Sequence, residues 1–232
     1  RVRRAAEGAQ ARVGGEGRPG ALAGLTMSLE ALLAGVDPRW HDATGGALDA
    51  GLLERARASR LGRRLLVGAL QAGPAAHLLA PSPDGFAGLI ERWSPMRLTA
   101  LHRDLGVLAY APAIRAEVSR DAVKRLKTQL AGSYLLALDR SIWDARVDPA
   151  LQASLCTTLT DALAAASLSQ RLFELLELQG RAELQAWAAQ REPPLADWAR
   201  LIHPPTELPP AHLPEKPLLV VHAHHYSRAI AA

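Results

Sequence analysis

The fold class is decided by residues 94–140, SPMRLTALHRDLGVLAYAPAIRAEVSRDAVKRLKTQLAGSYLLALDR. Ser94 is placed to cap a helix that begins at Pro95, because serine is favoured at the cap and proline at the first helical position. Four leucines then recur at three- and four-residue steps, which places them on one helix face: Leu98, Leu101, Leu105 and Leu108. We therefore predict a core-facing helix that Pro112 interrupts.

A second helix is predicted to start at Ser119. Its apolar stripe consists of Val123, Leu126, Leu130 and Tyr134. The outer face is basic, and we assign partner binding to the following residues on or beside it: Arg115, Arg120, Lys124, Arg125 and Lys127. An ordinary solvated helix face is the alternative interpretation. Binding or scaffolding is the first functional hypothesis, ahead of catalysis.

The composition favours helices throughout the chain. Of the 232 residues, 49% are apolar but only 4% are aromatic, so the core must be built mainly from Leu, Ala and Val. The net charge of +4 comes almost wholly from arginine, and a solvated basic face explains it more simply than nucleic-acid binding does. The single cysteine, Cys156, excludes an intramolecular disulfide and a thiolate zinc cluster, which fits a reducing cytoplasm.

Three regions are expected along the chain. Residues 1–20, rich in Arg and Gly, are predicted to be a disordered basic tail. Residues 21–203 are predicted to form a compact all-α domain of about eight helices. Residues 204–232 are predicted to be a Pro-rich extension that ends in a short strand. We expect a soluble chain, since no apolar run is long enough to span a bilayer and no signal-peptide pattern occurs.

Outside the central stretch, the predicted helices follow leucine repeats that stop at glycine or proline. They cover residues 21–34, 49–72 and 86–93, a segment that begins with Asp148 and Pro149, and two further segments that Gly180 separates. The last of these ends at Pro193 and Pro194.

The strand is predicted within residues 218–227, LLVVHAHHYS. In a strand, His222 and His224 lie on one face and become candidate ligands for a transition metal. Such a site normally needs a third protein ligand, and only Glu215 lies close by in the sequence. We therefore predict a polar strand end, with no native metal site and no cofactor.

Two catalytic motifs lack the context that their chemistry requires. The G-x-G-x-x-G of residues 15–20 has no strand before it and contains Pro19. The His-Arg-Asp-Leu of residues 102–105 matches the start of a kinase catalytic loop, but the later Asn is absent and the tetrad falls inside an amphipathic helix. His102 and Asp104 are therefore expected to be exposed helix residues. We predict no catalytic residue and no enzyme activity.

A DNA-binding alternative rests on residues 116–129, AEVSRDAVKRLKTQ, which look like the turn and recognition helix of a helix-turn-helix domain. Ser119, Arg120 and Lys124 would then lie near the helix start, within reach of phosphates and of base edges in the major groove. The preceding helix should run up to a tight turn, whereas the break at residues 110–112 comes several positions too early.

The central segment also resembles a protein family. In LGVLAYAPAIRAEVSRDAVKRLKTQLAGSYLLALDR, residues 105–140, a Leu-Gly-led apolar helix precedes a short break, and a long helix follows. The break contains Pro112 and Arg115, and the long helix contains Gly132 and Tyr134 near its end. This pattern resembles the SctK family of type III secretion proteins. Residues 36–43, VDPRWHDA, are similar to an early His-Pro-Ser-Trp-like element of that family, with Asp37 for the His and Arg39 for the Ser.

The resemblance covers roughly residues 29–145 and implies a noncatalytic cytoplasmic adaptor of the injectisome sorting platform. Such an adaptor links the cytoplasmic domain of the inner-membrane ring protein SctD to the pod protein SctQ, and so supports protein export. It works at the cytoplasmic face of the bacterial inner membrane, which it reaches through protein contacts only. Five tryptophans are either core fillers or interface anchors: Trp40, Trp93, Trp143, Trp187 and Trp198.

Overall fold

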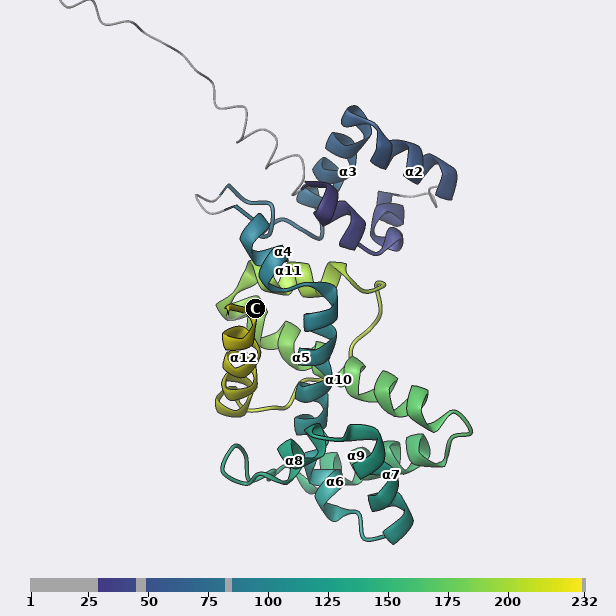
Figure 1. Ribbon diagram of the computed structural model, residues 1–232, viewed down its shortest axis with the longest axis vertical. Coiled ribbons are helices and arrows are strands. Elements are labelled where there is room, and N and C mark those ends of the chain that lie inside the picture. Colours follow the sequence, from purple (N-terminus) through teal and green to yellow (C-terminus); the bar gives the residue numbers. More distant parts are fainter. Residues whose placement is uncertain (1–28, 45–48, 82–84, 231–232) are drawn as a thin grey trace, which may run out of the picture.

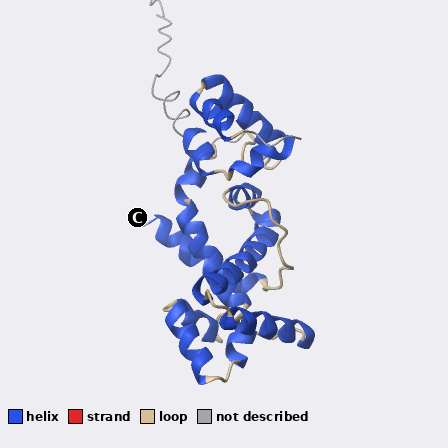
Figure 2. Cartoon of the chain, turned by 90° about the vertical axis from the view of Figure 1, so that its right-hand side faces the viewer, coloured by secondary structure: helices blue, strands red, loops and turns tan. Residues whose placement is uncertain are grey.

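A computed structural model of the protein describes residues 29–44, 49–81 and 85–230, and these residues contain helices and no strand (Figure 2). The predicted all-α fold is confirmed, while the predicted tail of residues 1–20 lies outside the described residues. No helix in the described part of the chain combines the length and the apolar character needed to cross a bilayer.

Residues 29–35 are helical and are followed by the 3-10 helix η1 (Pro38–Thr44). The remaining helices are α2 (Ala50–Ala58), α3 (Arg60–Ala72), α4 (Ala87–Arg92), α5 (Pro95–Ala109), α6 (Ala111–Ala116), α7 (Arg120–Leu130), α8 (Ser133–Leu138), α9 (Pro149–Ala164), α10 (Leu168–Arg191), α11 (Pro193–Leu201) and α12 (Glu215–Ile230).

The molecule is elongated, with α5 near its middle and α12 beside it (Figure 1). Helices α2 and α3 lie at one end, and α6 to α9 lie at the other. The most extensive helix pair is formed by α5 and α10. The leucine stripe predicted on α5 forms the centre of the core, since Leu98, Leu101, Leu105 and Leu108 are all fully buried.

The backbones of α5 and α10 meet at two glycines. A Cβ atom on Gly106 would lie 1.9 Å from the carbonyl oxygen of Leu176, and one on Gly180 would lie 1.7 Å from the carbonyl oxygen of His102. No side chain fits at either position. The predicted break at Gly180 is therefore wrong, because this glycine lets α10 run unbroken past α5 instead of ending a helix.

Gly106→Ala and Gly180→Ala are each expected to lower the free energy of unfolding by at least about 3 kcal/mol, because the added methyl group must force the two backbones apart. Urea denaturation followed by circular dichroism measures this loss. Gly68→Ala is the matched control: Gly68 lies inside α3 with no atom near its missing Cβ, so alanine there should be neutral or stabilising by up to ~1 kcal/mol. Equal effects at all three positions would contradict the close crossing.

Residues 202–214 form an extended strap that is anchored by one buried carboxylate. The side chain of Glu183, on α10, is 1% exposed and accepts hydrogen bonds from the backbone N–H groups of His212 and Leu213, each at 3.0 Å. Gln179 donates its amide N–H to the same carboxylate at 2.7 Å and to the carbonyl oxygen of Pro210 at 3.0 Å. The Pro-rich segment is thereby fixed against α10.

The predicted strand at residues 218–227 is wrong, because these residues belong to α12. Leu218, Val221 and His222 are buried and His225 is half-buried, a spacing of three and four residues that puts them on one helix face. Pro217 falls in the first turn, where a helix tolerates proline. A short apolar run does not by itself distinguish a strand from a buried helix segment.

Two predicted helices are each divided in the structure. The helix predicted over residues 49–72 breaks at Ser59, whose hydroxyl accepts a hydrogen bond from Gly62 N–H and caps α3. The helix predicted from Ser119 starts there as expected, but it ends at Leu130, since Ala131 has a φ of 46°. Tyr134 consequently lies in the next helix, α8.

Trp198, on α11, joins the first part of the chain to the central helices. It is fully buried, and its indole N–H donates to the carbonyl oxygen of Trp93 at 2.6 Å. A Cβ atom on Gly35 would lie 2.5 Å from the Trp198 ring. The adjacent Asp197 carboxylate accepts from the N–H groups of residues 77 and 78 at 2.8 and 3.1 Å. Of the other tryptophans, Trp93 and Trp143 are buried, while Trp40 and Trp187 are half-buried.

Candidate interaction surface

The basic face predicted around Ser119 is present on α7, at one end of the molecule (Figure 1). The Ser119 hydroxyl accepts from Ala122 N–H and caps the helix. Arg120, Lys124 and Lys127 are exposed, and none of them forms an ion pair with a described residue. The apolar side of α7 is anchored by Leu126 and Leu130, which are buried. A helix anchored by its apolar side thus holds three exposed cations toward solvent.

Arg125 and Lys127 also contact neighbouring elements. Arg125 is exposed overall, but its guanidinium donates to the carbonyl oxygen of Leu163, at the end of α9, at 3.0 Å. The Lys127 ammonium lies 5.7 Å from the centre of the Tyr134 ring, within the range of a cation–π contact. These two contacts fix the position of α7 relative to α8 and α9.

Arg115 does not join the α7 face, because its guanidinium points into the chain. It donates to the carbonyl oxygens of Ala137 at 2.6 Å, Asp144 and Trp143 at 2.9 Å and Asp139 at 3.3 Å. Burial lowers the pKa of this guanidinium. Arg115 therefore orders the loop between α8 and α9, and a partner would have to break four hydrogen bonds to reach it.

The expected exposure of His102 and Asp104 is wrong. Asp104 is half-buried: it accepts from the Ser133 hydroxyl at 2.6 Å and lies 2.9 Å from Nε2 of His225. Burial alone would raise the pKa of Asp104, but the hydrogen bonds from His225 and Ser133 outweigh it and keep that pKa below its usual value. The carboxylate stands between the serine and the histidine, which is not the order of a Ser-His-Asp triad, where the histidine contacts the hydroxyl.

His102 is fully buried, and its Nδ1 lies 3.3 Å from Nε2 of His203. Burial lowers the pKa of His203 to about 4, with a further contribution from Arg181. Burial, with the proximity of His203, lowers the pKa of His102 well below its ordinary value. Both imidazoles are therefore neutral at pH 7. Sequence reasoning missed this pair because 101 positions separate its members.

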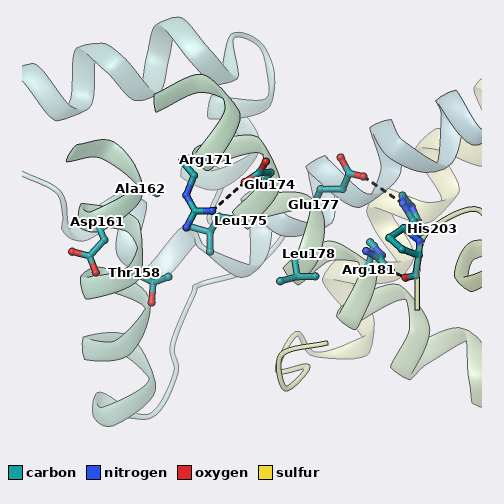
Figure 3. A pocket seen from close by; sticks show the side chains of 11 residues that line it. Thr158, Asp161, Ala162, Arg171, Glu174, Leu175, Glu177, Leu178, Arg181 and His203 are labelled. Carbon is teal, nitrogen blue, oxygen red and sulfur yellow. Dashed lines mark hydrogen bonds and ion pairs between the residues drawn. The ribbon is translucent and has the colours of Figure 1, made fainter. Parts of the chain in front are cut away.

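A groove of about 590 Å³ runs beside His203, between α9 and α10 (Figure 3). Its rim carries both signs of charge: Arg171 pairs with Glu174 at 3.2 Å, and Glu177 lies 3.7 Å from Nδ1 of His203. Burial raises the pKa of Glu177 and lowers that of Arg181. Acidic and basic side chains are therefore mixed along the groove.

The two histidines proposed as metal candidates diverge in the structure because α12 replaces the strand. His222 is buried between two indoles, with ring centres 5.1 Å from Trp93 and 4.9 Å from Trp187. His224 is exposed on another side of the helix. Within residues 29–44, 49–81 and 85–230, no three His, Cys, Asp or Glu side chains lie close enough together to hold a metal ion.

No protein-family model, curated protein or solved structure matches this chain.

The His102–His203 pair predicts a pH-dependent stability. Because folding lowers the pKa of His203 from 6.5 to about 4, the unfolded chain binds protons below pH 6.5 that the folded chain excludes. The free energy of unfolding should therefore fall between pH 6.5 and 4, with His203 contributing up to about 3 kcal/mol of that loss. In His203→Gln, urea titrations across this range should show a flatter dependence, while the exposed control His224→Gln should match the wild type. An unchanged slope in His203→Gln would refute the assignment.

Proposed function

We propose that this chain is a noncatalytic adaptor of a type III secretion injectisome, linking the cytoplasmic domain of the ring protein SctD to the pod protein SctQ at the inner membrane. The observation that carries the proposal is the exposed basic face of α7: Arg120, Lys124 and Lys127 are exposed and form no ion pair with the described residues, on a helix that packing holds in place. The SctK-like pattern of residues 29–145 supplies the identity of the system.

The surroundings of α7 suit a docking surface. The Arg115 guanidinium fixes the loop after α8, and Arg125 ties α7 to the end of α9. The exposed cations therefore sit on a platform that does not have to reorganise when a partner binds, which reduces the entropic cost of association. Their charge steers an acidic partner toward this end of the molecule and contributes more to the association rate than to the affinity.

DNA binding is the second candidate function, since Ser119, Arg120 and Lys124 lie at the amino end of α7 as a recognition helix would place them. The geometry favours it less. Glu117 accepts a hydrogen bond from Ser119 N–H at 2.7 Å, and Asp121 lies in the first turn of α7. These two carboxylates stand at the end of the helix that would approach phosphate groups, where they repel them.

The proposal is tested with Arg120→Glu/Lys124→Glu, which reverses two exposed charges and leaves the contact between Lys127 and Tyr134 in place. In cells with intact secretion genes, the wild-type chain should copurify with SctQ or SctD, and the variant should lose this recovery by about tenfold or more. Its helical circular dichroism should be unchanged. Arg140→Glu/Arg146→Glu is the matched control, as both residues are exposed on the α8–α9 loop, and it should retain the partners.

Recovery of neither protein with the wild-type chain would overturn the adaptor proposal. A mobility shift of DNA at low salt that disappears in Arg120→Glu/Lys124→Glu would instead establish the DNA-binding alternative.

A further inference from the structure

Helix α3 carries an apolar surface that the described residues leave uncovered. Leu61 and Leu65 are 68% and 66% exposed, and their spacing of four residues places them on one helix face. Gly68, Ala69 and Ala72 continue the same face toward the carboxyl end and are also exposed. We call these five residues the α3 stripe. No charged residue interrupts it.

The stripe is separate from the face by which α3 joins the core. Gly62, Leu66 and Leu70 are buried on the other side of the helix, and Gly62 approaches the backbone of Ala56 so closely that a Cβ atom would lie 2.3 Å from its carbonyl oxygen. Because that contact fixes the rotation of α3, the helix cannot turn to bury Leu61 and Leu65. Their exposure is a consequence of how α3 packs.

Arginines border the stripe on one side. Arg60 and Arg64 are exposed and form no ion pair or hydrogen bond with the described residues. The arginines nearer the core are already engaged: Arg63 donates to the carbonyl oxygen of Arg57 at 3.0 Å and pairs with Glu30 at 3.5 Å. Residues 50–72 hold five arginines and one glutamate, so this end of the molecule is strongly basic.

We propose that the α3 stripe and its arginine border dock an amphipathic helix of a partner protein, with leucine-type residues facing Leu61 and Leu65 and acidic residues facing Arg60 and Arg64. The small side chains of Gly68, Ala69 and Ala72 let a second helix approach closely over that half of the stripe. The arginines provide the charge complementarity that selects an acidic partner.

Two other occupants fit this surface less well. A second copy of the chain brings the same five arginines and one glutamate, so its approach is opposed by like charges. A membrane surface would attract the arginines, but the stripe offers only two large apolar side chains for insertion, with no aromatic residue beside them.

The α3 stripe lies at the opposite end of the molecule from α7 (Figure 1). The inference therefore does not rest on the function proposed for α7, and either surface can fail its test without the other. If both are occupied, the chain bridges two proteins across its long axis.

The test uses the full chain and a designed 18-residue helical peptide as the probe. The peptide carries leucines at positions i, i+4 and i+7 and glutamates on the flanks, and a second peptide replaces every glutamate by lysine. Fluorescence anisotropy should show saturable binding of the acidic peptide with a Kd on the order of 10–100 μM, and binding of the lysine peptide about tenfold weaker or more.

Three variants locate the binding. Leu61→Gln/Leu65→Gln should weaken binding of the acidic peptide by about tenfold or more while helical circular dichroism is retained, because both side chains are already solvated. Arg60→Glu/Arg64→Glu should reverse the preference in favour of the lysine peptide. Met96→Gln, which changes an 80% exposed apolar residue on α5, should bind the acidic peptide as the wild type does.

Several results would overturn the proposal: no saturable binding, equal affinity for the two peptides, or full affinity in Leu61→Gln/Leu65→Gln. Flotation of the chain with phosphatidylserine vesicles that Leu61→Gln/Leu65→Gln abolishes would assign the surface to a membrane. A dimer in light scattering that the same variant dissociates would assign it to a second copy.

Discussion

The backbone contact between α5 and α10 at Gly106 and Gly180 determines how the rest of the structure is arranged. With the carbonyl oxygen of His102 lying against Gly180 and that of Leu176 against Gly106, the two helices approach more closely than any side chain would allow. Tight backbone packing of this kind leaves little room to slide or rotate. The residues that α5 and α10 carry are therefore fixed relative to one another.

Several polar contacts depend on this fixed packing of α5 against α10. Buried polar side chains usually have a hydrogen-bonding partner. His102 is fully buried, and its imidazole lies against that of His203 in the strap. Glu183, three positions after Gly180, is held where it receives the backbone N–H groups of residues 212 and 213. The strap is thereby fixed, and α12 after it packs against α5 with His225 reaching Asp104. A change in the helix crossing would disturb all three contacts.

The two ends of the molecule are attached to this centre by different means. Two residues of α11 hold the amino-terminal part: the Trp198 ring packs against Gly35, and the Asp197 carboxylate accepts from the backbone N–H groups of residues 77 and 78, after α3. At the other end, Arg115 organises the α8–α9 loop through four carbonyl oxygens. Each end presents a helix whose exposed cations form no ion pair with any described residue, and the rigid centre keeps those two helices apart.

Much of the fold could be predicted from sequence, because leucine spacing and caps are local signals. Ser119 and Asp148 cap α7 and α9 as predicted, and the exposed cations of α7 follow from helical periodicity. Features that depend on distant partners could not be predicted. Gly180 indicates a helix break unless α5 is known to lie against it. Arg115 is predicted to be a surface cation unless the carbonyl groups that it binds are known. The error at α12 was avoidable, since Leu218, Val221, His222 and His225 already have helical spacing.

Native-state hydrogen exchange measures most directly whether the α5–α10 crossing is the stable centre of the protein. If it is, the slowest amides will lie in residues 101–109 and 172–184 and will exchange only through global unfolding, whereas those of α2, α3 and α7 will exchange through smaller openings. The account is contradicted if the amides around Gly106 and Gly180 exchange as fast as those of α2 and α3, or if a different helix pair retains the slowest amides.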